Sequence, residues 1–231
     1  MTFESQLTPE QQTLLKRLLD VFLQENAKLN LTALRTPEAC WIGNILDSLA
    51  LLDIPESSKL EAESSKLIDI GTGGGFPLLP LAIARPDWQC TGVDSIGKKI
   101  KADGNIVHTL SLKNVQLKAE RSEILGRDPH YREMFDFVTS RAVAPLNILL
   151  ELCAPFAKVG GYVVLWKSLH IEEELAASAA CQKTIHCSMV NAHRYTLPED
   201  FGERQLLIFK KESPISGLYP RAVGEAKRAP L

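Results

Sequence analysis

A glycine-rich loop is the part of the 231-residue sequence whose composition most directly indicates chemistry. It follows a short apolar segment, Leu67–Ile70, that is typical of a buried strand, and it carries glycine at Gly71, Gly73, Gly74 and Gly75. Because glycine has no Cβ, such a loop lets the backbone approach a cofactor closely. A tight structural turn would need fewer glycines, so the loop indicates a cofactor site at the carboxyl end of a strand.

The spacing of these glycines indicates which cofactor the loop binds. A dinucleotide loop has the pattern Gly-x-Gly-x-x-Gly, and a loop that begins at Gly71 has Phe76 where the third glycine would stand. A start at Gly73 fails in the same way at Leu78. The spacing Gly71-x-Gly73-x-Gly75 matches the loop of methyltransferases that use S-adenosylmethionine, so we expect this cofactor rather than a nicotinamide dinucleotide.

Two aspartates accompany the loop. Asp69 lies just before the first glycine, where it is expected either to hold the amino-acid end of the cofactor or to order the loop through water. Asp94 ends the next predicted strand, where a carboxylate can accept hydrogen bonds from both ribose hydroxyls. Taken alone, Asp94 would be a turn or helix-capping residue; with the glycine loop before it, we predict that it binds ribose.

Further polar residues follow the third, fourth and fifth predicted strands. Ser122 and Glu123 can bond the edge of adenine, although they would also suit a solvated helix start. Arg141 can contact the cofactor, the target base or a phosphate, and the alternative is an arginine that caps its strand at the surface. Lys167 either contacts RNA or is solvent-exposed. Arg141 and Lys167 are the candidate catalytic residues.

The sequence lacks the motifs of nucleophilic catalysis. It has no Ser-His-Asp pattern, no Asn-Pro-Pro-Tyr motif for exocyclic amines and no cysteine in a pyrimidine-C5 motif. A target such as guanine N7 already carries a lone pair, so positioning it in line with the methyl sulfonium is sufficient. Cys181, His186, Cys187 and His193 are close in sequence but lack zinc-finger spacing, and we predict no metal site.

Alternating strands and helices must position these residues. Strands are predicted at 67–70, 89–93, 115–118, 135–139, 162–166, 186–193 and 204–210, and helices at 78–84, 98–112, 146–156 and 171–180. This alternation predicts an α/β fold with a Rossmann-like, mostly parallel, seven-stranded sheet. The sheet belongs to a cofactor-binding domain that we place at residues 66–211.

Segments of different character flank this domain. Two predicted helices, Leu7–Lys28 with Thr8 as its N-cap and Pro37–Asp53, form an N-terminal helical appendage over residues 1–55. Residues 55–66 are serine-rich and contain Glu-Ser-Ser-Lys-Leu twice, which we interpret as a loop because no longer repeat supports it. Residues 212–231 are predicted to form a basic, irregular tail.

Composition restricts the class of protein. The formal net charge of −2 and the 45% hydrophobic content are ordinary for a soluble enzyme, so any RNA contact must come from local basic patches. The candidates are Lys98, Lys99 and Lys101; Arg204, Lys210 and Lys211; and Arg221, Lys227 and Arg228.

Five cysteines without a Cys-x-x-Cys motif, and the lack of a run of roughly 18 apolar residues, indicate a cytoplasmic protein with reduced thiols and no membrane span. A monomer is the default expectation.

Several motifs together resemble one known family. In this order they are similar to the GidB (RsmG) family of bacterial methyltransferases, which make 7-methylguanosine in small-subunit ribosomal RNA. The motifs are Asn30-Leu31-Thr32, Ile45-Leu46-Asp47-Ser48-Leu49, the loop from Asp69 to Pro77, the segment from Asp94 to Lys99, Ser140-Arg141-Ala142-Val143-Ala144, Glu203-Arg204, and Tyr219-Pro220-Arg221 with Pro230-Leu231.

The resemblance implies a function and a set of site residues. It implies that S-adenosylmethionine is the cofactor and that small-subunit ribosomal RNA, or the small ribosomal subunit, is the substrate. It also implies antiparallel pairing at the carboxyl-terminal edge of the sheet, and an RNA-facing side formed by the N-terminal helices. The cofactor pocket it implies consists of Gly71, Phe76, Asp94, Ser95, Ile96, Ser122, Glu123 and Arg141.

The sequence departs from the family pattern at some positions. Gly43-Asn44 stands where many members have Arg-His, Leu78 where members often have glycine, and Ser168 where many have glycine. The segment 102–105 is less apolar than in most members, and Gly104 within a helix costs about 1 kcal/mol relative to alanine. Two alternatives therefore stay open: a small-molecule methyltransferase, and a cofactor-binding RNA or assembly protein without catalysis.

Overall fold

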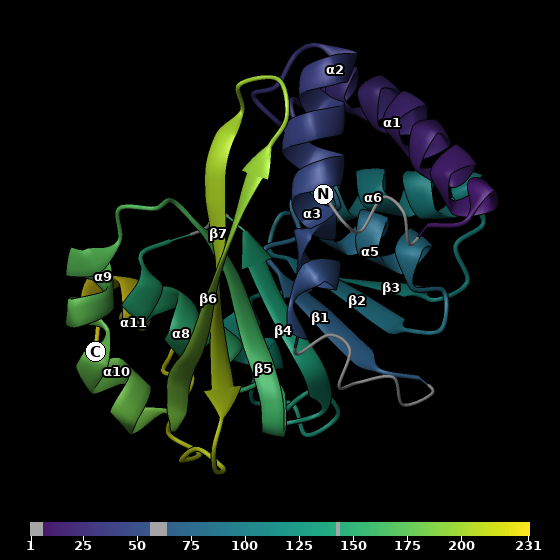
Figure 1. Cartoon of the computed structure of the whole chain (residues 1–231). Helices are drawn as coiled ribbons and strands as arrows, with labels where there is room; N and C mark the ends of the chain where they lie inside the picture. Colours follow the sequence, from purple (N-terminus) through teal and green to yellow (C-terminus); the bar gives the residue numbers. More distant parts are fainter. Residues whose placement is uncertain (1–6, 56–63, 142–143) are drawn as a thin grey trace.

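One seven-stranded sheet forms the centre of the protein (Figure 1). A computed structural model describes residues 7–55, 64–141 and 144–231, and its strand order is β3-β2-β1-β4-β5-β7-β6. Strands β1 to β5 are parallel, whereas β7 is antiparallel to both β5 and β6. The predicted fold class and its antiparallel edge are confirmed. The strands are β1 (Lys66–Ile70), β2 (Gln89–Asp94), β3 (Val115–Ala119), β4 (Phe135–Arg141), β5 (Ala157–Lys167), β6 (Cys187–Leu197) and β7 (Gly202–Lys211).

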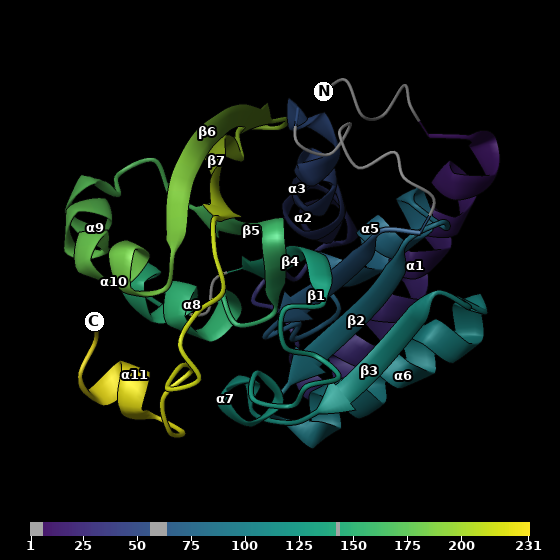
Figure 2. The same cartoon turned by 90° about the horizontal axis from the view of Figure 1, so that it is seen from below.

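Helices cover both faces of the sheet (Figures 1 and 2). They are α1 (Pro9–Leu29), α2 (Pro37–Cys40), α3 (Asp47–Leu49), α5 (Leu78–Ala84), α6 (Gly97–Leu110), α7 (Ser122–Leu125), α8 (Leu146–Cys153), α9 (Glu172–Ala177), α10 (Ala179–Thr184) and α11 (Glu225–Arg228). Side chains alternate along each strand between two cores. In β7, Leu206 and Ile208 join the core under α1, α5 and α6, and Leu207 and Phe209 join the core under α8 and α10.

Helix α1 begins at the predicted cap. The Thr8 hydroxyl accepts a hydrogen bond from the Gln11 amide at 3.3 Å, and the Gln11 side chain accepts one from the Thr8 amide at 2.8 Å. The buried face of the helix includes Leu18 and Phe22, and the Phe22 ring meets the ring of Phe76 edge-on at 4.7 Å between centroids. The N-terminal helix therefore packs directly on the end of the glycine loop.

The second helical segment changes its hydrogen-bond pattern part-way along. The predicted helix Pro37–Asp53 is continuous, but the π-helical turn η2 (Trp41–Leu46) follows α2, and the 3-10 turn η3 (Ala50–Asp53) follows α3. Single π turns inside helices are rare and are often found at functional sites. Here the Gly43 carbonyl within η2 accepts a hydrogen bond from Arg141 at the end of β4. The segment therefore binds the sheet through its own backbone.

Other predicted boundaries differ from the observed ones. The helix predicted at 171–180 is two short helices, α9 and α10, which meet at Ser178. Gly160 and Gly161, predicted to precede a strand, lie within β5, where a Cβ on Gly161 would be 2.9 Å from the Phe135 carbonyl oxygen. The serine-rich loop predicted at 55–66 lies mostly in residues 56–63, and positions 142–143 of the Ser140–Ala144 motif also lie outside the described residues.

The C-terminal tail is held on the sheet domain by arginines. Arg221 donates from Nε and Nη2 to the Glu151 carboxylate at 2.9 and 2.6 Å, and the Glu151 side chain is 1% exposed. The Arg132 guanidinium donates to the carbonyls of Ile215, Ser216 and Tyr219. Arg221 is therefore neutralised within the protein, contrary to the expectation that it adds to an RNA-binding patch. The tail is irregular except for the short helix α11.

Candidate functional site

A cavity of about 840 Å³ opens at the carboxyl ends of the parallel strands. Its volume is in the range of small-molecule sites, and its position is the one that α/β sheets use for ligands. A second hollow, of about 480 Å³, is lined by Lys66, Gln89 and Met134 and lies away from these ends. We therefore take the larger cavity as the candidate site. It is lined by Leu31, Thr32, Asn44, Ile70, Gly71, Thr72, Gly73, Gly74, Phe76, Val93, Asp94, Ser95, Lys99, Glu120, Arg121, Ser122, Glu123, Arg141, Ala144, Pro145, Ile148, Leu149, Leu152, Gly224 and Lys227.

The glycine loop forms the floor of this cavity. The amides of Gly71 and Thr72 donate to the Val93 carbonyl at 2.8 and 3.0 Å, which fixes the loop against β2. Gly73 has a φ of +63°, and only the Gly71 carbonyl would lie within 4 Å of a Cβ placed there, so its face toward the cavity is open. Gly75 does not line the cavity: a Cβ at this position would lie 2.4 Å from Leu79 of α5.

Asp94 joins the glycine loop to the start of α6. Its carboxylate accepts hydrogen bonds from the Gly73 amide at 3.1 Å and from the Ile96 amide at 2.8 Å, and the Lys99 ammonium lies 3.9 Å away. Asp94 is buried but lines the cavity, as does Ser95. Two amides leave part of the acceptor capacity of a carboxylate free. Ile96 is 41% exposed and does not line the cavity.

Two carboxyl groups are buried behind the loop. Asp69 accepts a hydrogen bond from the Thr139 hydroxyl at 2.9 Å, and burial raises its pKa to about 6. Asp103 of α6 has no hydrogen-bond partner for either oxygen among the described residues, and burial, with the charges of Asp69 and Asp94, raises its pKa to about 8. Asp69 does not line the cavity, so the geometry favours the expectation that it orders the loop over the expectation that it holds the cofactor directly.

The third side of the cavity combines α7 with the C-terminal tail. Ser122 and Glu123, which follow the third strand, begin α7 and line the cavity. The Glu123 carboxylate accepts hydrogen bonds from the Ser122 hydroxyl at 3.3 Å and from the Gly224 amide at 3.0 Å. Gly224 and Lys227 also line the cavity, so the tail completes this wall.

Arg141 connects β4 to the N-terminal helical segment. Its Nη1 donates to the Gly43 carbonyl at 2.8 Å and to the Asp47 carboxylate at 2.9 Å, while Nη2 donates to Asn44 Oδ1 at 2.9 Å. The guanidinium carbon lies 5.7 Å from the centre of the Phe76 ring, within the distance of a cation–π interaction. Arg141 lines the cavity, and three hydrogen bonds from its two Nη atoms are made to the protein.

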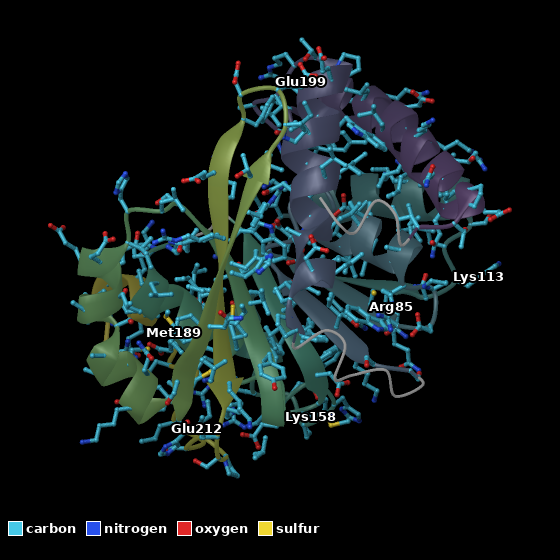
Figure 3. The ribbon with its side chains drawn as sticks, viewed as in Figure 1. Arg85, Lys113, Lys158, Met189, Glu199 and Glu212 are labelled. Atoms are coloured by element: carbon cyan, nitrogen blue, oxygen red, sulfur yellow. The ribbon has the colours of Figure 1, made fainter. Side chains whose placement is uncertain are left out.

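Asp47 is the centre of this contact. Its carboxylate accepts from Arg141 and from the Tyr195 hydroxyl at 2.6 Å, and its carbonyl accepts from the Trp166 indole at 2.9 Å. Burial and the Asp47 charge raise the pKa of Tyr195 far above its usual range. β4, β5 and β6 thus all hold the same turn of the N-terminal segment. Figure 3 shows Glu199 at the tip of the β6–β7 hairpin beside this segment, with Lys158 and Glu212 at the other end of the sheet.

Lys167 is not brought to the cavity with the other candidates. Its ammonium donates to the Glu174 carboxylate at 2.6 Å and to the Ala144 carbonyl at 3.0 Å, and the side chain is 11% exposed. The Lys211 side chain is fully buried and donates to Glu133 and to the Ala154 and Ala157 carbonyls, so it cannot contribute to a surface patch as expected. Both lysines are held in place by internal partners.

Sequence reasoning gave no role to Asn44, which lines the cavity, or to Asp47 and Asp103, which lie behind its wall. Asp47 stands in the Ile-Leu-Asp-Ser motif, so a buried acid within an apolar helix was a usable signal. Asn44 was noted only as a departure from the family pattern. Asp103 breaks the apolar face of α6, which is the signal that the buried carboxyl group leaves in the sequence.

Other expectations concern metals, thiols and membranes. Within residues 7–55, 64–141 and 144–231, no three His, Cys, Asp or Glu side chains gather as a metal site. All five cysteines are free and buried, and burial raises the pKa of the Cys90, Cys181 and Cys187 thiols to about 12. None of the described helices is long and apolar enough to span a bilayer.

Comparison with known proteins identifies the family. The family model described as rRNA small subunit methyltransferase G (GidB) matches residues 11–206. The chain belongs to this family. Ribosomal RNA small subunit methyltransferase G of Lactobacillus delbrueckii subsp. bulgaricus is 36% identical over 230 residues, which are 99% of this chain and 95% of the relative. The protein of the same name from Thermoanaerobacter sp. is 38% identical over 211 residues, 91% of this chain and 86% of the relative. The resemblance to the GidB family that the motifs indicated is therefore confirmed over nearly the whole of this chain.

The GidB-type fold is shared with more distant methyltransferases. The structure of M. jannaschii TYW2 in complex with AdoMet has a TM-score of 0.54 at 15% identity, covering 73% of this chain and 76% of that chain. A variant of the 16S rRNA (adenine(1408)-N(1))-methyltransferase of Catenulisporales acidiphilia has a TM-score of 0.52 at 14% identity, covering 71% of this chain and 94% of that chain. At these identities the likeness concerns the fold, which is that of class I methyltransferases.

Proposed function

We propose that this protein transfers a methyl group from S-adenosylmethionine to N7 of a guanine in small-subunit ribosomal RNA. The observation that carries the proposal is the single cavity in which the open glycine loop, the Asp94 carboxylate and the Arg141–Asn44 contact meet at the carboxyl ends of the strands. Membership of the rRNA small subunit methyltransferase G family supports RNA as the substrate over a small molecule. We also propose that the chain acts as a monomer, which sedimentation would test.

The residues that line the cavity fit the proposed cofactor. Asp94 has acceptor capacity left for ribose hydroxyls, and Gly73 leaves room for the amino-acid end beside the backbone. Ser122 and Glu123 lie on the β3 side, where we propose that they face adenine. Asp69 is buried behind the glycine loop, and we propose that it orders the loop and does not contact the cofactor. Ser95 completes the ribose side, and Ile96 contributes its amide to Asp94.

The proposed reaction requires the protein mainly to position the two reactants. When bound, S-adenosylmethionine supplies an electrophilic methyl group on a sulfonium. Guanine N7 carries a lone pair, so no proton must leave N7 before the bond to the methyl carbon forms, and the residues of the chain hold the two reactants in line.

Arg141 is proposed to act here by holding the N-terminal segment at the cavity wall. Lys167 is proposed to fix Ala144, which lines the same wall, through its hydrogen bond to that carbonyl.

Basic side chains lie in the cavity wall and on the two helices that supply them. Lys227 and Lys99 line the cavity, and Lys98, Lys101 and Arg228 are exposed on the same elements, α6 and α11. We propose that they contact RNA phosphates, which would position the substrate without reading its sequence. This arrangement explains how a chain with a net charge of −2 binds a polyanion.

One experiment tests the proposed function. Small ribosomal subunits are isolated from a strain that lacks this gene and are incubated with the purified protein and S-adenosylmethionine carrying a labelled methyl group. Mass-spectrometric mapping is expected to find one new methyl group on a guanine, at N7. Transfer to small molecules but not to subunits would support the small-molecule alternative, and cofactor binding by calorimetry without transfer would support the non-catalytic one. Failure to bind the cofactor would rule out all three.

A further inference from the structure

Asn44 lines the cavity and carries a buried hydrogen-bond donor that has no partner among the described residues. It lies in the π-helical turn η2, is 3% exposed and lines the cavity. Its Oδ1 accepts a hydrogen bond from Arg141 at 2.9 Å, whereas Nδ2 has no partner among the described residues. A buried amide donor without a partner destabilises the fold, so such a group in a residue of the cavity wall points to a bound ligand that accepts its hydrogen bond.

The orientation of this amide is determined by its neighbours. The Arg141 guanidinium has only donors, so a flipped amide would place its NH2 group against the guanidinium N–H groups. Arg141 is itself held by the Asp47 carboxylate and the Gly43 carbonyl. These contacts direct Oδ1 toward Arg141 and leave Nδ2 as the free group. The π turn adds to the constraint, because the Gly43 carbonyl that precedes Asn44 is committed to the same arginine.

Asn44 lies on the side of the cavity away from the ribose-binding residues. Arg141, its partner, ends β4, whereas Asp94 ends β2, and β1 lies between these strands. Two strand spacings correspond to about 10 Å. The adenosine end of the cofactor, if held by Asp94, is therefore separated from Asn44 by the width of the glycine loop. With the cofactor placed as proposed, Asn44 lies beyond its adenosine end, on the side left for the substrate.

We infer that Asn44 Nδ2 donates a hydrogen bond to O6 of the target guanine and thereby selects guanine over adenine. The inference rests on the proposed function. Guanine presents two acceptors, N7 and O6, on one edge, whereas adenine presents an acceptor and a donor there. Asparagine commonly reads adenine with both of its amide groups, but here Oδ1 is committed to Arg141. The remaining donor matches O6 and opposes the adenine amino group.

The first test separates substrate contact from cofactor contact. Asn44→Asp keeps the acceptor for Arg141 and the side-chain size, but replaces the donor Nδ2 by an oxygen. We expect kcat/KM for small subunits to fall about 10- to 100-fold, as for a lost contact that leaves a buried polar group unpaired, with cofactor affinity by calorimetry unchanged within about twofold. The control Asn191→Asp, in β6, adds the same charge away from the cavity. A parallel loss of cofactor affinity, or full activity in Asn44→Asp, would overturn the inference.

A second test addresses O6 itself. Once the methylated guanine is mapped, subunits are rebuilt with 2-aminopurine, which retains N7 but lacks O6, at that position. The wild-type protein should lose about 10- to 100-fold in kcat/KM on this substrate, and Asn44→Ala should lose little more on it than the wild type does. If the 2-aminopurine substitution and Asn44→Ala instead reduce kcat/KM by independent factors that multiply, Asn44 and O6 are not in contact. Absence of methyl transfer by the wild-type protein to any guanine would remove the proposed function, and this inference with it.

Discussion

Arg141 at the end of β4 and Asp47 in the N-terminal segment lie 2.9 Å apart, although they are separated by 94 residues in the sequence. The pair is largely buried, with the two side chains 17% and 9% exposed. It converts two helices that the sequence presents as an appendage into one wall of the cavity. Tyr195 and Trp166 bind the same aspartate, so four elements meet at one residue.

Loss of Asp47 should destabilise the fold. Asp47→Ala leaves the Arg141 charge buried without its carboxylate, and such changes typically cost about 3–5 kcal/mol. Tyr195→Phe removes one hydrogen bond of the same network and should cost about 1 kcal/mol. Urea unfolding followed by circular dichroism measures both. Equal and small losses for the two variants would show that the Arg141–Asp47 pair contributes little.

Asp94 should control cofactor affinity. Asp94→Ala removes the acceptor proposed for ribose and also the bonds that fix the Gly73 and Ile96 amides. We expect the dissociation constant for S-adenosylmethionine to rise about 10- to 150-fold, which corresponds to about 1.5–3 kcal/mol for hydrogen bonds to a charged group. Asp87→Ala is the matched control, because its carboxylate pairs with Arg85 at the surface. Calorimetry should show no change for this control.

Two glycines with the same φ should respond differently to alanine. Gly75 and Gly160 both have a φ of +85°, so alanine at either position incurs a backbone cost of about 1–2 kcal/mol. At Gly75 the new Cβ would also lie 2.4 Å from Leu79 Cδ1, whereas at Gly160 nothing lies within 4 Å. Gly75→Ala should therefore lose about 1–3 kcal/mol more in urea unfolding, by overpacking. It should also weaken cofactor binding, and Gly160→Ala should not; similar behaviour of the two would argue against a tightly packed loop.

Stability should fall with rising pH because of Asp103. Its folded-state pKa is about 8, above the usual 3.8, since burial and the charges of Asp69 and Asp94 outweigh the attraction of Lys99. Between these two pH values the folded chain holds a proton that the unfolded chain has lost, so each increase in pH favours unfolding, by at most about 1.4 kcal/mol per unit. Asp103→Asn removes this dependence, and its advantage over the wild type should grow from pH 4 to pH 8.

Urea unfolding at several pH values checks this difference. Asp20→Asn, on the exposed part of α1, serves as the control and should leave the pH profile of the wild type in place. If Asp103→Asn and the wild type keep a constant difference in free energy of unfolding across this range, the Asp103 carboxyl group is not protonated in the folded protein.

Local patterns in the sequence predicted much of the fold. Short apolar runs that alternate with helical patterns located all seven strands, and the cap at Thr8 located the start of α1, because these signals depend on neighbouring residues only. Boundaries were less predictable. The extension of β5 over Gly160 and Gly161 depends on its pairing with β4, which lies far away in the sequence.

The chemistry of individual residues also required the tertiary structure. The sequence places Lys211 and Arg221 in predicted basic patches, but Glu133 and Glu151 neutralise them inside the protein. Lys167 is likewise paired with Glu174 rather than directed into the cavity. A charged side chain in a sequence carries no record of whether a counter-charge will lie beside it after folding.

The sequence by itself determined the class of fold, the glycine loop and the position of Asp94, because loop conformation and strand-end placement follow from residue types and spacing within one short segment. Only the tertiary structure decided what the N-terminal helices do. The Arg141–Asp47 contact and the free amide of Asn44 arise from residues nearly a hundred positions apart, which only the packing of α1 to α3 on the sheet brings together.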